Sequence, residues 1–239
     1  MERTIVSLTS HGIRLKYVAK TIYSILRQCK LKIVLTLYKD DLKNITPELK
    51  KMIDAGYVEL IKSDIDLGPH LKYYWAMKNH KDCNVITIDD DCLYSDDFIS
   101  SLLEYHKKDQ KAVIARRAHL MTFTEGKLNN YNSWSMCVKC SNDYRHILAT
   151  GVGGILYPSN VLDVDTIDLD ELKKCFFADD IYLKVLENRR NVKILIIPIR
   201  EDHPREQQSL EVKSIALCNK NVRCNRNDEY IRLFYKELQ

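Results

Sequence analysis

The stretch Asn84-Val85-Ile86-Thr87-Ile88-Asp89-Asp90-Asp91 decides the fold. Val85 to Ile88 is rich in β-branched side chains and predicts a short buried strand. Three carboxylates follow without a break, and such adjacent like charges repel one another and favour solvation. Mg²⁺ or Mn²⁺ relieves that repulsion, since hard cations take oxygen ligands, usually one or two carboxylates plus substrate phosphates. The stretch therefore indicates either a metal-nucleotide site at the carboxyl end of a central strand or a polar turn that caps a helix near Ser95.

The composition bounds the class of protein. The chain has 239 residues, of which 45% are hydrophobic, and no linker, internal repeat or low-complexity tract divides it; we therefore expect one domain. The net charge of +4 suits an anionic small ligand or an acidic membrane surface and is too small to indicate nucleic-acid binding. No apolar run reaches the roughly 18 residues of a transmembrane helix. The N-terminus lacks the apolar core of a signal peptide, so we expect a cytoplasmic protein.

Eight cysteines are scattered along the chain. Without an export signal, we expect them to be reduced. Cys137-Val138-Lys139-Cys140 is a lone CxxC motif. A structural zinc site is not favoured there, because no second CxxC or histidine pair stands at zinc-site spacing.

The hydrophobic pattern alternates between strand and helix over the first half of the chain, which favours an α/β fold with a Rossmann-like, mostly parallel central sheet flanked by helices. From Arg116 to Gly151 this alternation stops, which predicts a long irregular insert. Three glycines follow in Gly151-Val152-Gly153-Gly154, typical of a close backbone approach to a ligand or of a sharp bend. The predicted strands cover 4–8, 32–37, 57–61, 85–88, 112–115 and 192–197, and the predicted helices 15–29, 47–56, 71–79, 95–107, 179–186 and 228–238.

Six stretches then occur in one order: IVSLTSHGIR, DLGPHLKYYWAMK, ITIDDDCLY, RRAHL…YNSW, GVGGILYP and ADDIYLKVL. Together, over residues 4–190, they resemble bacterial family 2-type glycosyltransferases of the GT-A fold, in particular those of capsule, lipooligosaccharide or other surface-polysaccharide assembly. The resemblance implies a single GT-A domain over 1–239, with a nucleotide-binding half (1–115) and a donor-sugar and acceptor half (116–239). It also implies a metal-dependent, inverting transfer of a sugar from a UDP-sugar to a glycan or lipid-linked glycan.

The resemblance assigns the metal site. Asp89 and Asp91 are the outer acids of the family's DxD motif. Asp91 is expected to bind the Mn²⁺ or Mg²⁺ that bridges the donor diphosphate, and Asp89 to face the ribose or the water shell of the metal. His203 follows a late strand, where related enzymes place a further metal ligand. The alternative for His203 is an ordinary surface histidine beside Pro204.

The resemblance also implies a donor-binding set. Thr9 and Arg14 stand where the family's first strand and loop hold the nucleoside. Asp64 or Asp66 fits an acid that hydrogen-bonds the base or ribose. Lys72 fits a cation near the nucleotide, or else an exposed helix residue. The full set of donor-binding candidates is Thr9, Arg14, Asp64, Asp66, Lys72, Asp89, Asp90, Gly153 and Gly154.

Asp179 and Asp180 match the acidic pair that supplies the catalytic base in inverting family members. The chemistry needs a carboxylate that takes the proton from the acceptor hydroxyl as it attacks the anomeric carbon. We assign the base to Asp180 and sugar or acceptor binding to Asp179, with little to separate them. Both acids open a predicted helix, so capping is the alternative. Tyr131 and Trp134 either stack on a sugar ring or anchor their loop.

Two other functions stay open. A sugar nucleotidyltransferase also places acids and Mg²⁺ at a strand end, but normally carries a glycine-rich basic loop, and the Ser10–Gly12 loop has one glycine. A non-catalytic nucleotide- or glycan-binding protein on the same scaffold is the second. The expected partners are a nucleotide sugar and a glycan or lipid-linked glycan acceptor. The basic, aromatic tail (223–236) either rests on the inner face of the cytoplasmic membrane or packs on its own domain.

Overall fold

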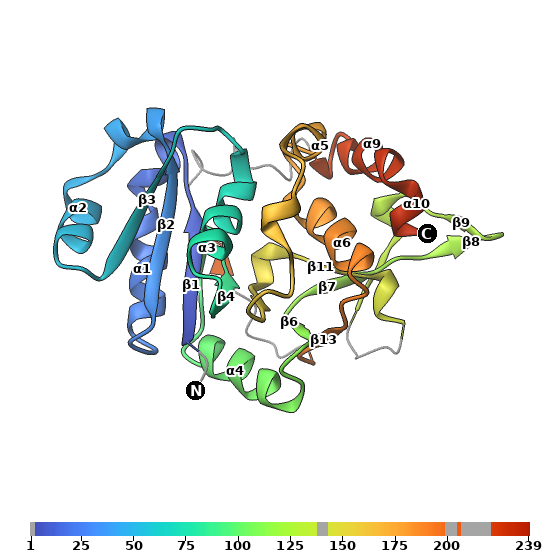
Figure 1. Cartoon of the computed structure of the whole chain (residues 1–239), viewed down its shortest axis with the longest axis horizontal. Coiled ribbons are helices and arrows are strands. Elements are labelled where there is room, and N and C mark those ends of the chain that lie inside the picture. The colour runs from blue at the N-terminus through green and yellow to red at the C-terminus, as the bar shows by residue number, and fades with distance from the viewer. Residues whose placement is uncertain (1–2, 138–142, 199–204, 207–220) are drawn as a thin grey trace.

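The computed structural model describes residues 3–137, 143–198, 205–206 and 221–239. Within them a seven-stranded sheet, in the order β13-β6-β12-β4-β1-β2-β3, runs through the centre of the molecule (Figure 1). Its strands are β1 (Arg3–Thr9), β2 (Lys32–Tyr38), β3 (Val58–Ser63), β4 (Cys83–Thr87), β6 (Val113–Ala115), β12 (Ile155–Tyr157) and β13 (Ile194–Ile196). Neighbouring strands are parallel except at β12, which is antiparallel to β4 and β6. The predicted α/β class with a mostly parallel sheet is confirmed.

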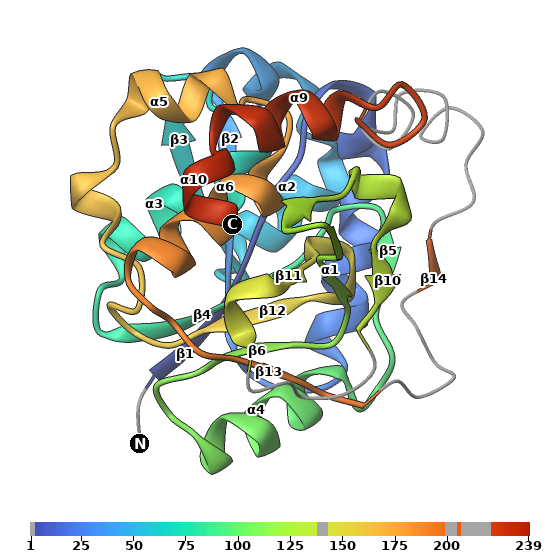
Figure 2. The same cartoon turned by 90° about the vertical axis from the view of Figure 1, so that its right-hand side faces the viewer.

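Helices cover both faces of the sheet, and each face has its own apolar core. One core receives side chains from α1 (Val18–Leu26), α2 (Pro47–Asp54) and α4 (Phe98–Lys108). The other receives them from α3 (Tyr74–Asn79), α5 (Leu169–Lys174), α6 (Asp179–Arg189), α9 (Arg226–Leu233) and α10 (Tyr235–Leu238). Figure 2 shows α4 beneath the sheet and α9 and α10 on the far side from it. Both faces of the sheet are therefore buried, as parallel sheets require.

Short 3₁₀ segments carry several of the loops that matter below. They are η1 (Gly12–Lys16), η2 (Lys39–Asn44), η3 (Gly68–Lys72), η4 (Tyr131–Ser133), η5 (Tyr144–His146), η6 (Gly151–Gly153) and η7 (Val164–Thr166). Two of the predicted helices begin as such segments: the one expected over 15–29 divides into η1 and α1, and the one expected over 71–79 into η3 and α3. The predicted tail helix is likewise interrupted, at Phe234, between α9 and α10.

The expectation of an irregular insert between Arg116 and Gly151 was wrong for the described residues. They form a three-stranded sheet of β10 (Ser135–Met136), β7 (Ala118–Leu120) and β11 (Ile147–Ala149), and a hairpin of β8 (Phe123–Thr124) and β9 (Lys127–Leu128). Figure 1 shows that hairpin at the opposite end of the molecule from α1 and α2. Strands this short leave no alternation long enough to detect in a sequence.

Trp134 belongs to this insert and lies in the core, 6% exposed, where its indole Nε1 donates to the carbonyl of Asn129 at 2.9 Å. Of the two alternatives for this residue, the structure supports loop anchoring. A buried indole whose one donor is satisfied has no face left for a sugar.

The strand directions bring several chain segments to one edge of the sheet. Because β4 and β6 are both antiparallel to β12, they run parallel to each other. Chain therefore leaves β1 at Thr9, β4 at Asp89 and β6 at Arg116 along the same edge, and the loop 151–154 enters β12 there. Open α/β sheets bind ligands outside the carboxyl ends of their strands. Any site on this scaffold is expected at this edge.

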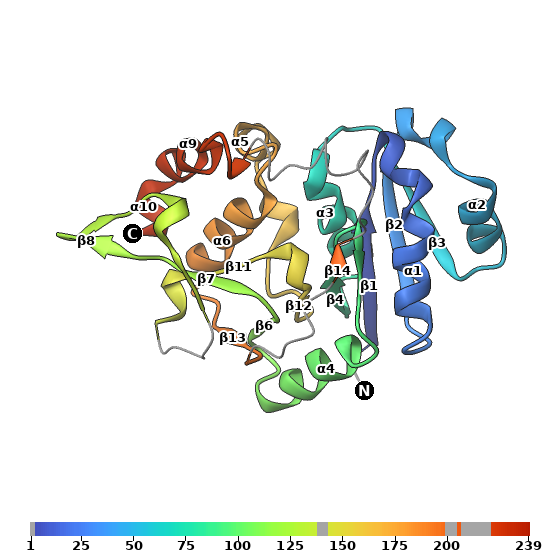
Figure 3. The same cartoon turned by 180° about the vertical axis from the view of Figure 1, so that it is seen from behind.

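The short strand β14 (Arg205–Glu206) pairs with β5 (Cys92–Leu93), directly after the acidic triplet. Figure 2 shows β14 beside β5 at the edge of the molecule, and Figure 3 shows the same strand from behind. The candidate metal ligand His203 lies outside the described residues, as do Cys140 and Cys218. No disulfide joins two of the six described cysteines. Within the described part of the chain, no helix combines the length and apolar character needed to cross a membrane.

Helix α6 carries a buried ion pair. Lys184 and Glu187, with side chains 0% and 2% exposed, approach to 3.6 Å, and Lys184 Nζ donates to the carbonyl of Tyr144 at 2.9 Å. Burial raises the pKa of Glu187 to about 7, against the opposing charge of Lys184, and burial lowers the pKa of Lys184.

The raised pKa of Glu187 predicts a pH-dependent stability. The folded state holds the Glu187 proton more tightly than the unfolded chain, so this contribution to stability is full below the unfolded pKa and is lost as pH rises through about 7. Relative to Glu187→Gln, the wild-type unfolding free energy should fall by on the order of 2 kcal/mol between about pH 5 and 8. Urea titrations at each pH measure it. The exposed Glu104→Gln is the matched control, and parallel pH profiles for wild type and Glu187→Gln would contradict the prediction.

Candidate functional site

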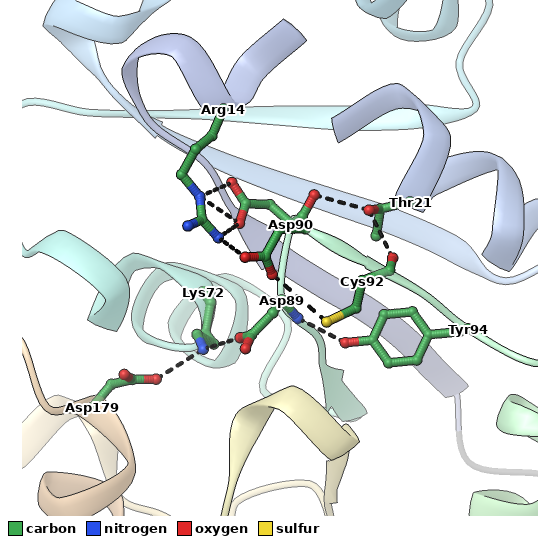
Figure 4. A network of polar contacts seen from close by, with 9 residues as sticks. Arg14, Thr21, Lys72, Asp89, Asp90, Cys92, Tyr94 and Asp179 are labelled. Carbon is green, nitrogen blue, oxygen red and sulfur yellow. Dashed lines mark hydrogen bonds and ion pairs between the residues drawn. The ribbon is translucent and has the colours of Figure 1, made fainter. Parts of the chain in front are cut away.

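The acidic triplet after β4 is held by an arginine from the first loop (Figure 4). Arg14 lies on η1, and its Nε is 3.0 Å from both carboxylate oxygens of Asp90 while its Nη2 contacts Asp90 Oδ1. The same Nη2 is 2.8 Å from Asp91 Oδ2. Gly12, at φ +51°, gives η1 its entry turn, and its N–H donates to Asp41 Oδ1 at 2.7 Å. The first loop thus delivers a fixed cation to the acids.

The backbone of the triplet is fastened from two sides. The Thr21 hydroxyl contacts the carbonyls of Asp90 and Cys92 at 2.9 and 2.8 Å. The N–H of Asp89 donates to the hydroxyl of the buried Tyr94 at 3.0 Å. These contacts fix the direction in which the acids leave the strand. Figure 4 shows the side chains of Asp89 and Asp90 pointing to different cations, Lys72 and Arg14.

The surroundings of Asp91 destabilise its charged form. Burial raises its pKa to about 6, with further increases from Asp89 and Asp90, although Arg14 opposes the shift. Burial by itself lowers the pKa of Arg14, but Asp90 and Asp91 overcome that and raise it, so the guanidinium stays charged. A carboxylate destabilised by its like-charged neighbours has capacity for an additional cation.

Lys72 joins the triplet to the second half of the chain. Its residue is 6% exposed, and its Nζ lies 2.6 Å from Asp89 Oδ1 and 2.9 Å from Asp179 Oδ2. Burial lowers its pKa, but Asp179 and Asp89 more than compensate and hold it well above the usual value. The alternative of an exposed helix residue was therefore wrong. Lys72 is a buried ammonium shared by two acids that stand ninety positions apart in the sequence.

Asp179 and Asp180 begin helix α6 but have different surroundings. Asp179 is 7% exposed and paired with Lys72; burial raises its pKa, but Lys72 outweighs that and leaves it lowered. Asp180 is half-buried, and its Oδ1 accepts the Gly151 N–H at 3.0 Å. Burial and the charge of Asp179 raise the pKa of Asp180 well above its usual value. Neither side chain caps its own helix, since α6 has no side-chain cap.

The glycines of the loop 151–154 pack closely against other side chains of the protein. A Cβ on Gly151 would lie 3.0 Å from Lys72 Nζ, 3.2 Å from Asp180 Oδ1 and 3.3 Å from Asp89 Oδ1. A Cβ on Gly153 would lie 2.5 Å from the Cβ of Arg117. A Cβ on Gly154, whose φ is +80°, would lie 2.4 Å from the ring of Phe98. Gly151 is thus the contact point of the three site groups.

Gly151→Ala is expected to lower turnover by about 10²-fold, because displacement of reacting groups by a fraction of an ångström to one ångström has that effect. The φ of Gly151 is not in the left-handed region, so the chain should fold. Steady-state kinetics with circular dichroism as a folding check measure the effect. Ser100→Ala, which removes a hydroxyl group from an exposed helix position, is the control. Equal turnover of the two variants would contradict the central position of Gly151.

Three of the sequence candidates do not contact this group. The Thr9 hydroxyl donates to the carbonyl of Thr36 at 2.8 Å, inside the sheet. Asp64 and Asp66 are exposed, and Asp66 Oδ1 accepts the N–H of Gly68 at 2.9 Å in a local turn. No ion pair to a described cation is formed by either acid. They lie in the loop that leads from β3 into η3.

His70 was missed by the sequence analysis. Its ring is fully buried; Nε2 donates to the carbonyl of Cys175 at 3.0 Å, and Nδ1 accepts from the Tyr73 hydroxyl at 2.8 Å. Burial lowers its pKa to about 4, so the imidazole is neutral. It ties η3, which carries Lys72, to the segment before Asp179. The signal was its place in the Gly68-Pro69-His70 turn, two residues before Lys72.

Taken together, the edge of the sheet holds five acids and two cations in neighbouring groups of contacts: Asp90 and Asp91 with Arg14, Asp89 and Asp179 with Lys72, and Asp180 with the Gly151 N–H. Among the described residues, no group of three or more His, Cys, Asp or Glu side chains is arranged to hold a metal ion. One or two carboxylates are nevertheless what protein sites usually give Mg²⁺, with phosphates and water completing the shell. The acids fit that role, with the shifted Asp91 foremost.

A family model described as glycosyl transferase family 2 matches residues 11–153. The chain belongs to this family. The match spans the triplet, Lys72 and Gly151, that is, the first loop through the start of the glycine loop. A comparison with curated protein sequences found no significant match.

Solved structures show the same fold. S. aureus TarS 1-349 in complex with UDP superposes with a TM-score of 0.53 at 12% identity, over 84% of this chain and 59% of that one. The 4-diphosphocytidyl-2C-methyl-D-erythritol synthase from Anaerococcus prevotii gives 0.53 at 12%, over 89% and 94%. This family 2 chain thus spans about three-fifths of the TarS chain. At such identities the likeness establishes the GT-A-like fold and leaves the chemistry to the residues.

Proposed function

We propose that this family 2 member is an inverting glycosyltransferase that moves a sugar from a UDP-sugar to a glycan or lipid-linked glycan acceptor, as in bacterial surface-polysaccharide assembly. The observation that carries the proposal is the convergence on Gly151 of Asp180, Lys72 and Asp89. It places the carboxyl group of Asp180, whose pKa is raised, beside Asp89 and Lys72. UDP is favoured as the nucleotide because TarS, of the same fold, binds it.

Asp180 is the proposed general base. Inversion needs one carboxylate that takes the acceptor hydroxyl proton while that oxygen attacks the anomeric carbon from the face opposite the leaving diphosphate. Asp179 is committed to Lys72 at 2.9 Å, whereas Asp180 is half-buried and forms no ion pair among the described residues. Its raised pKa strengthens it as a base. The Gly151 N–H fixes one oxygen and leaves the other to meet the hydroxyl.

Lys72 and Arg14 are proposed to stabilise the negative charge that grows on the nucleoside diphosphate. Both cations are held in place before substrate arrives, so the stabilisation needs little reorganisation. His70 positions Lys72 through the Cys175 carbonyl. Gly153 and Gly154 shape the wall against which the donor sugar lies, and Asp90 holds Arg14 in place.

Asp91, with Asp89 beside it, is proposed to hold Mn²⁺ or Mg²⁺. When bound, the ion supplies a Lewis acid that neutralises the leaving diphosphate. Asp91 Oδ2 already contacts Arg14, so a bound ion would share that carboxylate with the guanidinium. His203 stays a prediction for a further ligand, and Thr9, Asp64 and Asp66 stay predictions for nucleoside contacts.

We further propose that the chain acts as one domain whose halves are 1–115 and 116–239, since the seven-stranded sheet takes strands from both. We propose that the protein acts in the cytoplasm, at the inner face of the cytoplasmic membrane. For the described part of the tail, α9 and α10 pack against α6, with Tyr230, Ile231 and Phe234 in the core. Any membrane contact is therefore left to the outer face of these helices.

Calorimetric titration of UDP, GDP, CMP and ADP, each with and without Mn²⁺, tests the donor assignment. We expect tight binding of UDP that requires Mn²⁺, and at least tenfold weaker binding by Asp91→Ala. The exposed Asp170→Ala is the matched control. If none of the nucleotides binds under either condition, or if Asp91→Ala binds UDP as well as wild type does, the donor site is assigned wrongly.

A further inference from the structure

Arg117 carries a charge that the proposed mechanism does not use. Its half-buried guanidinium donates from Nη1 to the Thr150 hydroxyl at 2.8 Å. Among the described residues no carboxylate lies within ion-pairing distance of it. Arg14 and Arg116 differ from it, because each has an acidic partner. Arg14 pairs with Asp90 and Asp91, and Arg116 lies 3.6 Å from Asp97. A partly buried cation with a neutral partner has unmet demand for an anion.

The strand order places Arg117 beyond the base, away from the acidic triplet. β6, which ends before Arg116, is separated from β4 by β12, so the two strand ends are two spacings apart, on the order of 10 Å. Between them lies the glycine loop, where Gly151 holds Asp180 and Gly153 packs on Arg117. Arg14 and Lys72 lie on the side of that loop that holds the acidic triplet. Arg117 lies on the other side, against Gly153.

Two further side chains lie within electrostatic reach of Arg117. The pKa of the Tyr131 hydroxyl is raised to about 12 by burial and by Asp180, while Arg117 opposes the shift, so the phenol lies within electrostatic reach of both. The His119 ring meets that of Tyr131 at 5.5 Å between centroids. His119 Nδ1 is buried and has no hydrogen-bond partner among the described residues. Burial and Arg117 lower the pKa of His119 to about 4, so Arg117 is the cation of this group.

We propose that Arg117, with Tyr131 and His119 beside it, binds the carboxylate or phosphate of an acidic acceptor sugar whose hydroxyl Asp180 activates. This rests on the proposed function and names its acceptor class. A guanidinium presents a planar fork of donors that matches a carboxylate or phosphate with two parallel hydrogen bonds. Arg117 gives one of its donors to Thr150 and keeps the rest for a ligand. The hydroxyl of Tyr131 offers a contact for a sugar hydroxyl.

Ligand-observed NMR titrations of glucuronate, glucose 6-phosphate and glucose test the proposal, on the enzyme alone and saturated with UDP and Mn²⁺. We expect at least one acidic sugar to bind tenfold or more tightly than glucose; which of the two does so distinguishes carboxylate from phosphate. Arg117→Gln should abolish that preference, and Arg117→Lys should keep part of it. Arg145→Gln, which removes the same charge from an exposed position, is the control.

Equal binding of glucose and both acidic sugars to the wild-type enzyme would overturn the proposal. So would a preference that survives in Arg117→Gln. If Arg117→Gln instead selectively weakens UDP-glucuronate relative to UDP-glucose, the anion belongs to the donor, and the acceptor assignment is wrong. Failure of UDP to bind the wild type would refute the proposed function alone, because the sugar titrations on the free enzyme are read independently of UDP.

Discussion

Replacing Asp180 with asparagine is expected to lower the rate of sugar transfer, or of UDP-sugar hydrolysis with water as acceptor, by about 10²- to 10⁴-fold. The amide has nearly the shape of the carboxyl group and can still accept the Gly151 N–H through its oxygen, 3.0 Å away in the wild type. It cannot take a proton from the attacking hydroxyl. UDP release from a panel of UDP-sugars, followed by a coupled assay, measures the loss.

Two observations separate this effect from simple damage. UDP affinity of Asp180→Asn, measured by calorimetry, should remain within a few-fold of wild type, because Asp180 makes no ion pair with Lys72 or Arg14 among the described contacts. The matched control is the exposed Asp170→Asn. If Asp180→Asn retains wild-type turnover, the base lies elsewhere, and Asp179 becomes the residue to test.

Removing the shared ammonium has the largest expected effect on stability. Lys72→Met leaves Asp89 and Asp179 facing each other with no cation between them, where Lys72 stood 2.6 and 2.9 Å away. Breaking a buried ion pair by removal of one partner costs about 3–5 kcal/mol. The pKa of Asp179 then rises, because burial is no longer opposed by the charge of Lys72. Urea denaturation gives the unfolding free energy, and calorimetry with UDP should show weaker binding.

The design includes two comparisons. Lys72→Arg keeps the charge and should lose less stability than Lys72→Met, with the remaining loss set by the fit of a larger group beside Gly151. Lys50→Met removes a lysine from an exposed pair with Asp54, 3.2 Å apart, and should cost at most about 0.5 kcal/mol. A cost for Lys72→Met no larger than that for Lys50→Met would show that the buried pairing contributes nothing.

Local sequence patterns predicted the part of the fold that rests on local physics. The β-branched run before Asp89 became β4, and Pro47 opened α2 while Gly56, at φ +75°, followed its end. The central strand β12 was not predicted. It has three residues behind a glycine-rich loop, and its pairing with β4 and β6 depends on long-range contacts that periodicity does not record. The small sheet of β7, β10 and β11 was missed for the same reason.

The candidate site was predictable in its residue types and not in its connections. Carboxylates after a buried strand indicated a cation, and the structure shows two protein cations already there, Arg14 and Lys72. That Lys72 meets Asp179, and that Gly151 touches both Lys72 and Asp180, follows from tertiary packing. Arg117 was visible only as part of a polar stretch, because its lack of a carboxylate partner among the described residues is a property of the folded chain.

The stereochemistry of the reaction tests the central claim most directly. Proton NMR of the first product formed from an α-linked UDP-sugar, recorded before the anomers equilibrate, reports whether the anomeric carbon has inverted. A single displacement assisted by Asp180 predicts the β-anomer as the first product, formed by wild type and at a strongly reduced rate by Asp180→Asn. First appearance of the α-anomer would contradict the account, because retention requires chemistry other than one proton transfer to Asp180.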